Sequence, residues 1–386
     1  MSDVNSIAFA VNPNDIPSFL LDWELTKLCN LDCSYCPVGI EGGHDNSTKH
    51  PPLEECLHTI DFMYEYVDLY MQARRPNQRK VILNVYGGES LFHPDIVEIL
   101  EACRSKYEKY KDRWYLTITC TTNAVVGQNL WSRIVPLIDQ FSMSYHAENL
   151  PKQKQQYCDN LLYLKQHNKK SKSIIMMHND PDRWTDCENI INFCQEHSID
   201  YLVKAIDVPD NQWSYTPEQF ARLKEFWISK TRPLQRIEYK KSMDTLGATG
   251  NTISLNEGRA CCGGRQLSLN SDLRSSVSFV PAQGFRGWSC SVNWFFLFVQ
   301  QLTGAVYTNK DCRTSTNGRV EPLGYLSEST QIINQLKTQL DGNMPVIKCV
   351  KKICMCGFCA PKAKSPEEFM KLIKRHVPDD IFVANL

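Results

Sequence analysis

The chain has 386 residues, of which 42% are hydrophobic and 22% are charged. This composition is ordinary for a globular protein, and the length allows one large α/β domain and a smaller module. Lys and Arg together total 43, as do Asp and Glu, so the formal net charge is zero and no general field attracts nucleic acid or an anionic membrane.

Targeting and membrane-spanning segments are not expected. The first 18 residues lack a cationic stretch followed by an apolar one, so they do not resemble a signal peptide. The most apolar run, Trp294–Val299, is far too short to cross a bilayer and is predicted to be a buried strand. We therefore expect a cytoplasmic protein without a membrane partner, whose 17 cysteines need an explanation other than disulfides.

From Phe19 to about Thr231, short β-rich runs alternate with longer helical ones. Strands are expected at Phe19–Thr26, Val81–Tyr86, Tyr115–Thr121, Gln140–Tyr145, Ser173–His178 and Asp200–Ile206. Helices are expected from Leu53 to Met71 and at Pro94–Lys111, Gln128–Asp139, Gln153–Asn168, Trp184–Glu196 and Pro217–Lys230. Six such units in a row predict a parallel sheet, because parallel strands need a crossover that is usually a helix. Periodicity alone leaves a partial barrel and an open doubly wound sheet as alternatives.

A tight group of cysteines follows the first strand: Cys29, Cys33 and Cys36. Three thiolates at this spacing can bind one [4Fe-4S] cluster and leave its fourth iron open to a reactant. The alternatives are a zinc knuckle or three structural thiols. Zinc usually needs four ligands in spaced pairs, and only the loop residues His44 and His50 lie nearby as a fourth.

The pattern C-x-x-x-C-x-x-C, with Tyr35 before the last cysteine, resembles the signature of the radical S-adenosylmethionine (SAM) superfamily. The resemblance covers Phe19–Ile206 and implies a partial (β/α)6 TIM-like barrel in which the open iron binds the amino and carboxylate groups of SAM. It also implies an oxidoreductase or modifying enzyme. An electron from a donor such as flavodoxin or ferredoxin would cleave SAM to a 5′-deoxyadenosyl radical, which abstracts hydrogen from the substrate.

Later strand ends carry further family landmarks. Gly87, Gly88 and Glu89 resemble the Gly-Gly-Glu element that binds the SAM amino group, although such a tripeptide is more often a plain turn. Asn123 ends the third strand as in the family's Thr-Asn-Gly, with Ala124 in place of glycine. Ser144, in preference to Ser142, lies at the end of the fourth strand, where a serine of the family commonly contacts the ribose or carboxylate of SAM. The expected cofactor-binding residues are Tyr35, Gly87, Gly88, Glu89, Asn123 and Ser144.

After Arg232, glycine and serine become frequent and cysteines cluster again. This part resembles the C-terminal module known as SPASM in its two-cluster form and twitch in its one-cluster form. We expect one auxiliary [4Fe-4S] cluster, since four ligands per cluster is usual. Its expected ligands are Cys290, Cys312, Cys356 and Cys359. Cys354 competes with Cys356, the remaining Cys261, Cys262 and Cys349 allow a second cluster, and a zinc site is the alternative.

The expected divisions are an N-terminal extension at 1–18, a radical SAM barrel core at 19–234 and a small α+β auxiliary-cluster domain at 235–386. Other cysteines are expected in the core: Cys56, Cys103, Cys187 and Cys194. Asp311 and Arg313 flank Cys312 and are expected to form a solvated ion pair.

The substrate is expected to be a small polar molecule or a peptide. About eighteen residues precede the first strand, too few for a leader-binding domain, which favours a small molecule or a leader-independent peptide. The auxiliary cluster would bind substrate or accept an electron during an oxidation, rearrangement or cross-link. The rivals are a SPASM-type peptide maturase and a non-catalytic iron–sulfur or zinc scaffold. A nucleic-acid-modifying enzyme is disfavoured by the zero net charge.

Overall fold

The computed structural model describes residues 7–8, 18–36, 49–74, 79–206, 215–230, 286–290, 292–308, 322–340, 347–349, 362–365, 367 and 369. Its main feature is a sheet of strand order β11-β10-β9-β2-β3-β4-β5-β6-β7. The predicted parallel strands are confirmed as β2 (Phe19–Thr26), β3 (Lys80–Gly87), β4 (Tyr115–Thr122), β5 (Gln140–His146), β6 (Lys170–Met177) and β7 (Tyr201–Ala205).

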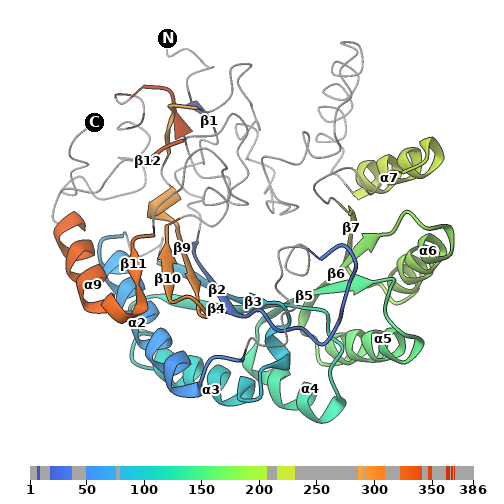
Figure 1. Ribbon diagram of the computed structural model, residues 1–386, viewed down its shortest axis with the longest axis horizontal. Coiled ribbons are helices and arrows are strands. Elements are labelled where there is room, and N and C mark those ends of the chain that lie inside the picture. The colour runs from blue at the N-terminus through green and yellow to red at the C-terminus, as the bar shows by residue number, and fades with distance from the viewer. Residues whose placement is uncertain are drawn as a thin grey trace.

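The predicted helices are confirmed within a few residues. They are α2 (Leu53–Gln72), α3 (Ile96–Tyr107), α4 (Gln128–Ile134), α5 (Pro151–Gln166), α6 (Pro181–Glu196) and α7 (Pro217–Lys230). α4 ends earlier than expected because a 3-10 turn with a proline, Val135–Leu137, replaces its last turn. Figure 1 shows these helices in an arc along the outer side of the curved sheet. Among the helices of the described residues, none is both long and apolar enough to cross a bilayer.

The two faces of the sheet differ in polarity. On β4, the buried side chains of Leu116, Ile118 and Cys120 alternate with half-buried threonines. The outer face packs against the helices in one hydrophobic core, which includes Cys56, Cys103, Cys187 and Cys194 as predicted. A doubly wound sheet would carry helices on both faces, whereas the described helices α2 to α7 cover the outer face, as in a partial barrel. The inner, concave face carries polar side chains on β3 and β4 and an apolar cluster near β2 and β9.

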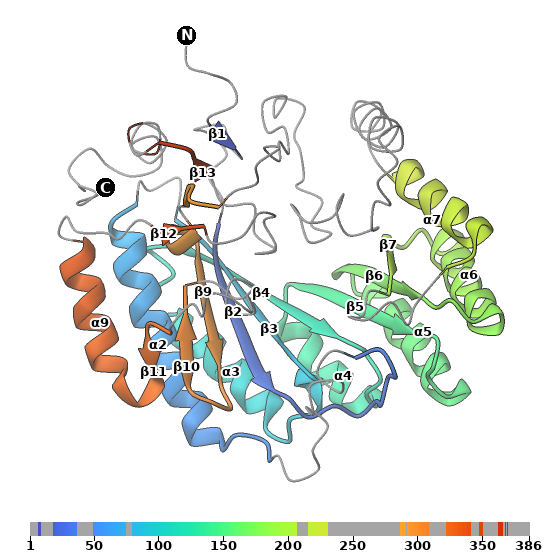
Figure 2. The same ribbon diagram turned by 45° about the horizontal axis from the view of Figure 1, so that its top comes forward.

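The edge of the parallel sheet beside β2 is extended by distant segments. β9 (Phe296–Gln300) pairs with β2 in parallel, and β10 (Ala305–Tyr307) and β11 (Gly324–Tyr325) follow in antiparallel order. Every residue of β9 is buried, which confirms the apolar run at 294–299 as a buried strand, although a 3-10 turn occupies Val292–Trp294. α9 (Ser329–Thr338) lies beside α2 (Figures 1 and 2).

A second, antiparallel sheet has the order β1-β13-β8-β12. It joins β1 (Ile7–Ala8), β13 (Lys362–Ala363), β8 (Ser289–Cys290) and β12 (Ile347–Lys348). Cys290 belongs to an apolar cluster with Leu20 and Phe298, so this sheet packs on the inner face of the main one near β2 and β9 (Figure 2). A smaller C-terminal sheet therefore exists, while the domain limits proposed at 18 and 234 stay a prediction.

Candidate functional site

The three N-terminal cysteines lie on a loop that leaves the carboxyl end of β2. This cysteine loop, residues 27–36, passes over the ends of the neighbouring strands and is held at both of its ends. All three thiols are half-buried and free of disulfides. Because the carboxyl ends of parallel strands are where α/β folds place their active sites, the loop lies where the sequence predicts the chemistry.

Gly87 and Gly88 pack directly against the start of the cysteine loop. A Cβ atom on Gly87 would lie 2.1 Å from the carbonyl oxygen of Thr26, and one on Gly88 would lie 2.4 Å from that of Lys27. The Gly88 amide donates to the Thr26 carbonyl at 2.8 Å. We expected these glycines to admit a ligand. The described contact is with the protein's own backbone, so any larger residue would displace the loop.

Glu89 is 1% exposed and ties the end of β3 to the end of β4. Its carboxylate accepts hydrogen bonds from the Leu91 amide at 3.0 Å, the Thr122 hydroxyl at 2.9 Å and the Asn123 amide at 2.6 Å. Burial raises the pKa of Glu89 to about 7, although the three hydrogen bonds act in the opposite direction. Its contact with the SAM ammonium group stays a prediction.

Asn123 reaches the first cysteine. Its Nδ2 donates to Asn30 Oδ1 at 2.7 Å and lies 3.7 Å from the sulfur of Cys29. Asn30 in turn donates to the Val125 carbonyl at 2.7 Å. Ala124 has φ of 56°, the left-handed conformation that favours glycine, so an alanine occupies a position that glycine would take without strain.

The turn after β4 is fixed from behind by α5. The buried side chain of Asn160 donates from Nδ2 to the carbonyls of Ala124 at 2.8 Å and Val126 at 2.9 Å. Gln128 donates to the Asn160 carbonyl oxygen at 2.6 Å. Asn160 was not predicted from sequence, yet it holds the turn that touches Cys29.

The thiols influence one another electrostatically. Burial raises the pKa of Cys29 to about 11, and Glu89 and Cys36 add to the rise. Burial, followed by the charges of Cys29 and Glu148, raises the pKa of Cys33 as well. Both thiols are therefore protonated near neutral pH without metal, and metal binding must displace their protons.

Within the described ranges, no three His, Cys, Asp or Glu side chains close around one point as ligands of a single ion would. In a [4Fe-4S] cluster each thiolate binds a different iron, so the ligands stand farther apart. Three half-buried thiols on one loop, Cys29, Cys33 and Cys36, are the donor set that such a cluster needs.

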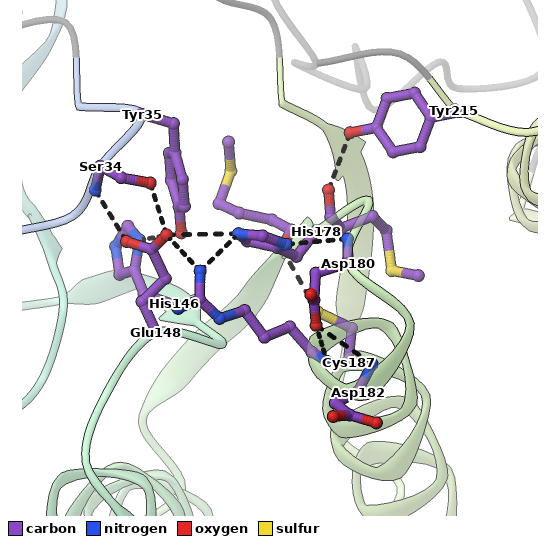
Figure 3. Close-up of polar contacts among 12 residues, drawn as sticks. Ser34, Tyr35, His146, Glu148, His178, Asp180, Asp182, Cys187 and Tyr215 are labelled. Carbon is purple, nitrogen blue, oxygen red and sulfur yellow. Dashed lines mark hydrogen bonds and ion pairs between the residues drawn. The ribbon is translucent and has the colours of Figure 1, made fainter. Parts of the chain in front are cut away.

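Tyr35 anchors the far end of the loop over β5, β6 and β7. Its ring is 4% exposed and packs with Ile206 and Met176. Its hydroxyl lies 2.8 Å from Nδ1 of His146, and its ring stacks on that imidazole with centroids 5.8 Å apart (Figure 3). Burial lowers the pKa of His146 to about 4, so this imidazole is neutral at physiological pH.

Glu148, in the turn after β5, holds Ser34 beside Tyr35. Its carboxylate accepts from the Ser34 amide at 2.7 Å and the Ser34 hydroxyl at 2.5 Å. Arg183 on α6 lies 2.7 Å from the same carboxylate, and His178 lies 3.2 Å from it. Burial alone would raise the pKa of Glu148, but the bonds from Ser34, with His178 and Arg183, lower it below its usual value. None of these partners was predicted from sequence.

Ser144 lies on the inner face of β5, with Ser142 and His146 at alternate positions of the same strand. Both serines are half-buried, so the choice between them stays a prediction.

A row of polar side chains crosses the inner face of the sheet from β2 to β4. Asn84 donates to Asp22 at 2.8 Å and accepts from Thr119 at 3.1 Å.

Of the predicted auxiliary ligands, the structure describes Cys290. Its side chain is 4% exposed in β8. Cys349, left unassigned from sequence, is also buried, and its amide donates to the carbonyl of Trp288 at 2.8 Å, so both cysteines lie on the β8–β12 strand pair. Six other predicted or competing positions lie outside the described residues: Cys261, Cys262, Cys312, Cys354, Cys356 and Cys359. The same holds for Asp311 and Arg313.

No protein-family model and no curated protein matches the chain. Solved structures of similar arrangement include Streptococcus suis SuiB bound to S-adenosylmethionine, at 13% identity and TM-score 0.46, covering 85% of this chain and 69% of that chain. SuiB bound to precursor peptide SuiA has 14% identity and TM-score 0.47, covering 85% and 68%. Native anSMEcpe with bound AdoMet has 15% identity and TM-score 0.48, covering 82% and 80%. A likeness at this level assigns no family and no residue role to the chain.

Proposed function

We propose that the chain is a radical SAM enzyme. One observation carries the proposal: a loop with Cys29, Cys33 and Cys36 is fixed at the carboxyl end of a partial (β/α)6 barrel, with Gly87 and Gly88 packed against its start. The motif glycines and the cysteines, more than fifty residues apart in sequence, form one assembly. A plain glycine turn would not need that contact.

Cys29, Cys33 and Cys36 would hold a [4Fe-4S] cluster, with Tyr35, Gly87, Gly88, Glu89, Asn123 and Ser144 around the SAM site. When bound, the cluster supplies the electron that cleaves SAM and so generates a radical able to abstract hydrogen. The chain's own residues do the positioning. Asn123 fixes the loop beside Cys29, Glu89 fixes Asn123, and the buried side chains of Tyr35 and Ile206 exclude water from the far end.

The polar inner face supports a polar substrate, either a small molecule or a peptide. Asp22 and Asn84, with Thr119 and Thr121, offer hydrogen-bonding groups along the face where the barrel would enclose it. A twitch- or SPASM-like auxiliary cluster on Cys290, Cys312, Cys356 and Cys359 would bind this substrate or accept its electron. A flavodoxin or ferredoxin would supply the first electron, and the expected location is the cytoplasm.

The experiment is reductive SAM cleavage. Protein reconstituted anaerobically with iron and sulfide and reduced with dithionite should convert SAM to 5′-deoxyadenosine and methionine. Replacing Cys29, Cys33 and Cys36 by alanine should abolish this conversion. Cys158→Ala is the matched control, because this half-buried thiol lies on the outer helix α5. Undiminished cleavage in the triple variant would refute the proposal, and a bound cluster without any cleavage would support a non-catalytic iron–sulfur scaffold.

A further inference from the structure

The contact between Glu148 and Ser34 is a two-point one (Figure 3). Both the amide and the hydroxyl of Ser34 donate to the same carboxylate, at 2.7 and 2.5 Å. Ser34 stands between Cys33 and Cys36 in the chain. A single bond would let the loop pivot about it. Two bonds to one residue fix the direction of the backbone between two of the three cysteines.

Arg183 also donates to this carboxylate, and His178 lies beside both groups. Arg183 Nη1 lies 2.7 Å from the carboxylate. The Asp180 amide donates to Nδ1 of His178 at 3.0 Å, and Nε2 of that ring lies 3.2 Å from Glu148 and 2.9 Å from Arg183 Nη1. Burial lowers the pKa of His178, in agreement with a neutral ring. The amide and hydroxyl of Ser34 and the guanidinium of Arg183 all donate to Glu148, and an ionised carboxylate, which only accepts, matches these three donors.

We propose that Glu148 is a positioning residue for the cysteine loop, and that its negative charge, balanced by Arg183, sets the reduction potential of the cluster bound there. This inference rests on the proposed function. The potential of an iron–sulfur cluster depends on nearby net charge and on hydrogen bonds around its ligands. A carboxylate beside the loop disfavours the added electron, and a guanidinium favours it. Because the Arg183 side chain is 44% exposed and that of Glu148 is 11% exposed, the charge of Arg183 is more strongly screened.

The positioning role is tested by iron retention. Glu148→Ala removes both bonds to Ser34, so the reconstituted protein should lose iron to a chelator about tenfold faster or more. Ser34→Ala should act in the same direction, and combining it with Glu148→Ala should add less than its separate effect, because one hydrogen bond is removed twice. Asp186→Asn is the control. Asp186 lies on α6, as Arg183 does, and pairs with Lys154 of α5 at 2.5 Å. The change removes this ion pair and leaves the cysteine loop untouched.

The electrostatic role is tested by redox titration of the cluster, followed by electron paramagnetic resonance. Glu148→Gln should move the potential to a more positive value, and Arg183→Gln should move it by less, to a more negative value. A purely structural role would not give opposite signs. Equal potentials, shifts of the same sign, or iron loss no faster than in Asp186→Asn would overturn the inference. Those results in a protein that still cleaves SAM would leave the proposed function intact, whereas a wild-type chain that binds no cluster would refute both.

Discussion

The two ends of the cysteine loop have different neighbours. At the Cys29 end these are the glycines Gly87 and Gly88 and the amide side chain of Asn123. At the Ser34 end they are the carboxylate of Glu148, the guanidinium of Arg183 and the imidazoles of His146 and His178. The first end depends on steric fit, which salt does not change. The second depends on charge, which solvent screens in proportion to exposure. One loop is thus fixed by shape at its start and by electrostatics at its tip.

Gly88→Ala tests the steric end and should have the largest effect. The new Cβ would stand 2.4 Å from the Lys27 oxygen and 2.5 Å from the Leu28 oxygen, so the loop must move. We expect a loss of about 3 kcal/mol in unfolding free energy, the upper part of the usual cost of overpacking, and loss of bound iron. Chemical denaturation and iron analysis measure both. Gly127→Ala is the matched control, because its Cβ would meet nothing within 4 Å.

Glu89→Gln tests the buried carboxylate that supports the same end. Because the pKa of Glu89 is raised to about 7, the folded metal-free protein keeps a proton that the unfolded chain releases at lower pH. Unfolding free energy should therefore fall as pH rises, by about 2 kcal/mol between pH 5 and pH 7. The glutamine variant should lack this decline. Parallel pH curves for the two proteins would show that Glu89 is ionised throughout.

Most of the architecture could be predicted from sequence, because each strand and helix carries its own periodicity. The strand Phe19–Thr26 and the helix at 217–230 match their predicted limits. The cysteine triad was evident from spacing. Glu148, His178 and Arg183 were not. Each is an ordinary polar residue; Glu148 meets the loop at Ser34, 114 positions away, and the other two contact Glu148. The pairing of β1 with β13 was equally hidden, because two-residue strands leave no pattern.

Tyr35→Phe separates two interactions at the Ser34 end of the loop, the hydrogen bond between Tyr35 and His146 and the stacking of their rings. This change removes the 2.8 Å bond to His146 and keeps the aromatic stack. A loss of about 1 kcal/mol in unfolding free energy is expected. Iron content should be retained, because the hydrogen bonds from Ser34 to Glu148 remain. Tyr115→Phe, at a residue 63% exposed, provides the baseline for removing a tyrosine hydroxyl. Equal stability of the two variants would mean that the bond contributes nothing.

The smallest expected effect is that of salt. Raising the salt concentration should speed chelator removal of iron from the wild type about twofold, because screening weakens the pair of Glu148 with the 44% exposed side chain of Arg183. In Arg183→Gln the salt dependence should vanish. If salt still speeds iron removal from this variant, the charges that salt screens are not those of the Glu148–Arg183 pair.

The parallel pairing of β9 with β2 has a consequence for how the protein is made. β2 is synthesised well before β9, its neighbour that begins at Phe296, and the bond from Trp23 to Gln301 spans 278 positions. At about 5–20 residues per second, that edge of β2 stays unpaired for roughly tens of seconds of translation. Contacts so distant in sequence also slow folding. The strand that leads into the cysteine loop is therefore started early and completed late, and during that interval its open edge is the part of the nascent chain most exposed to pairing with the wrong partner.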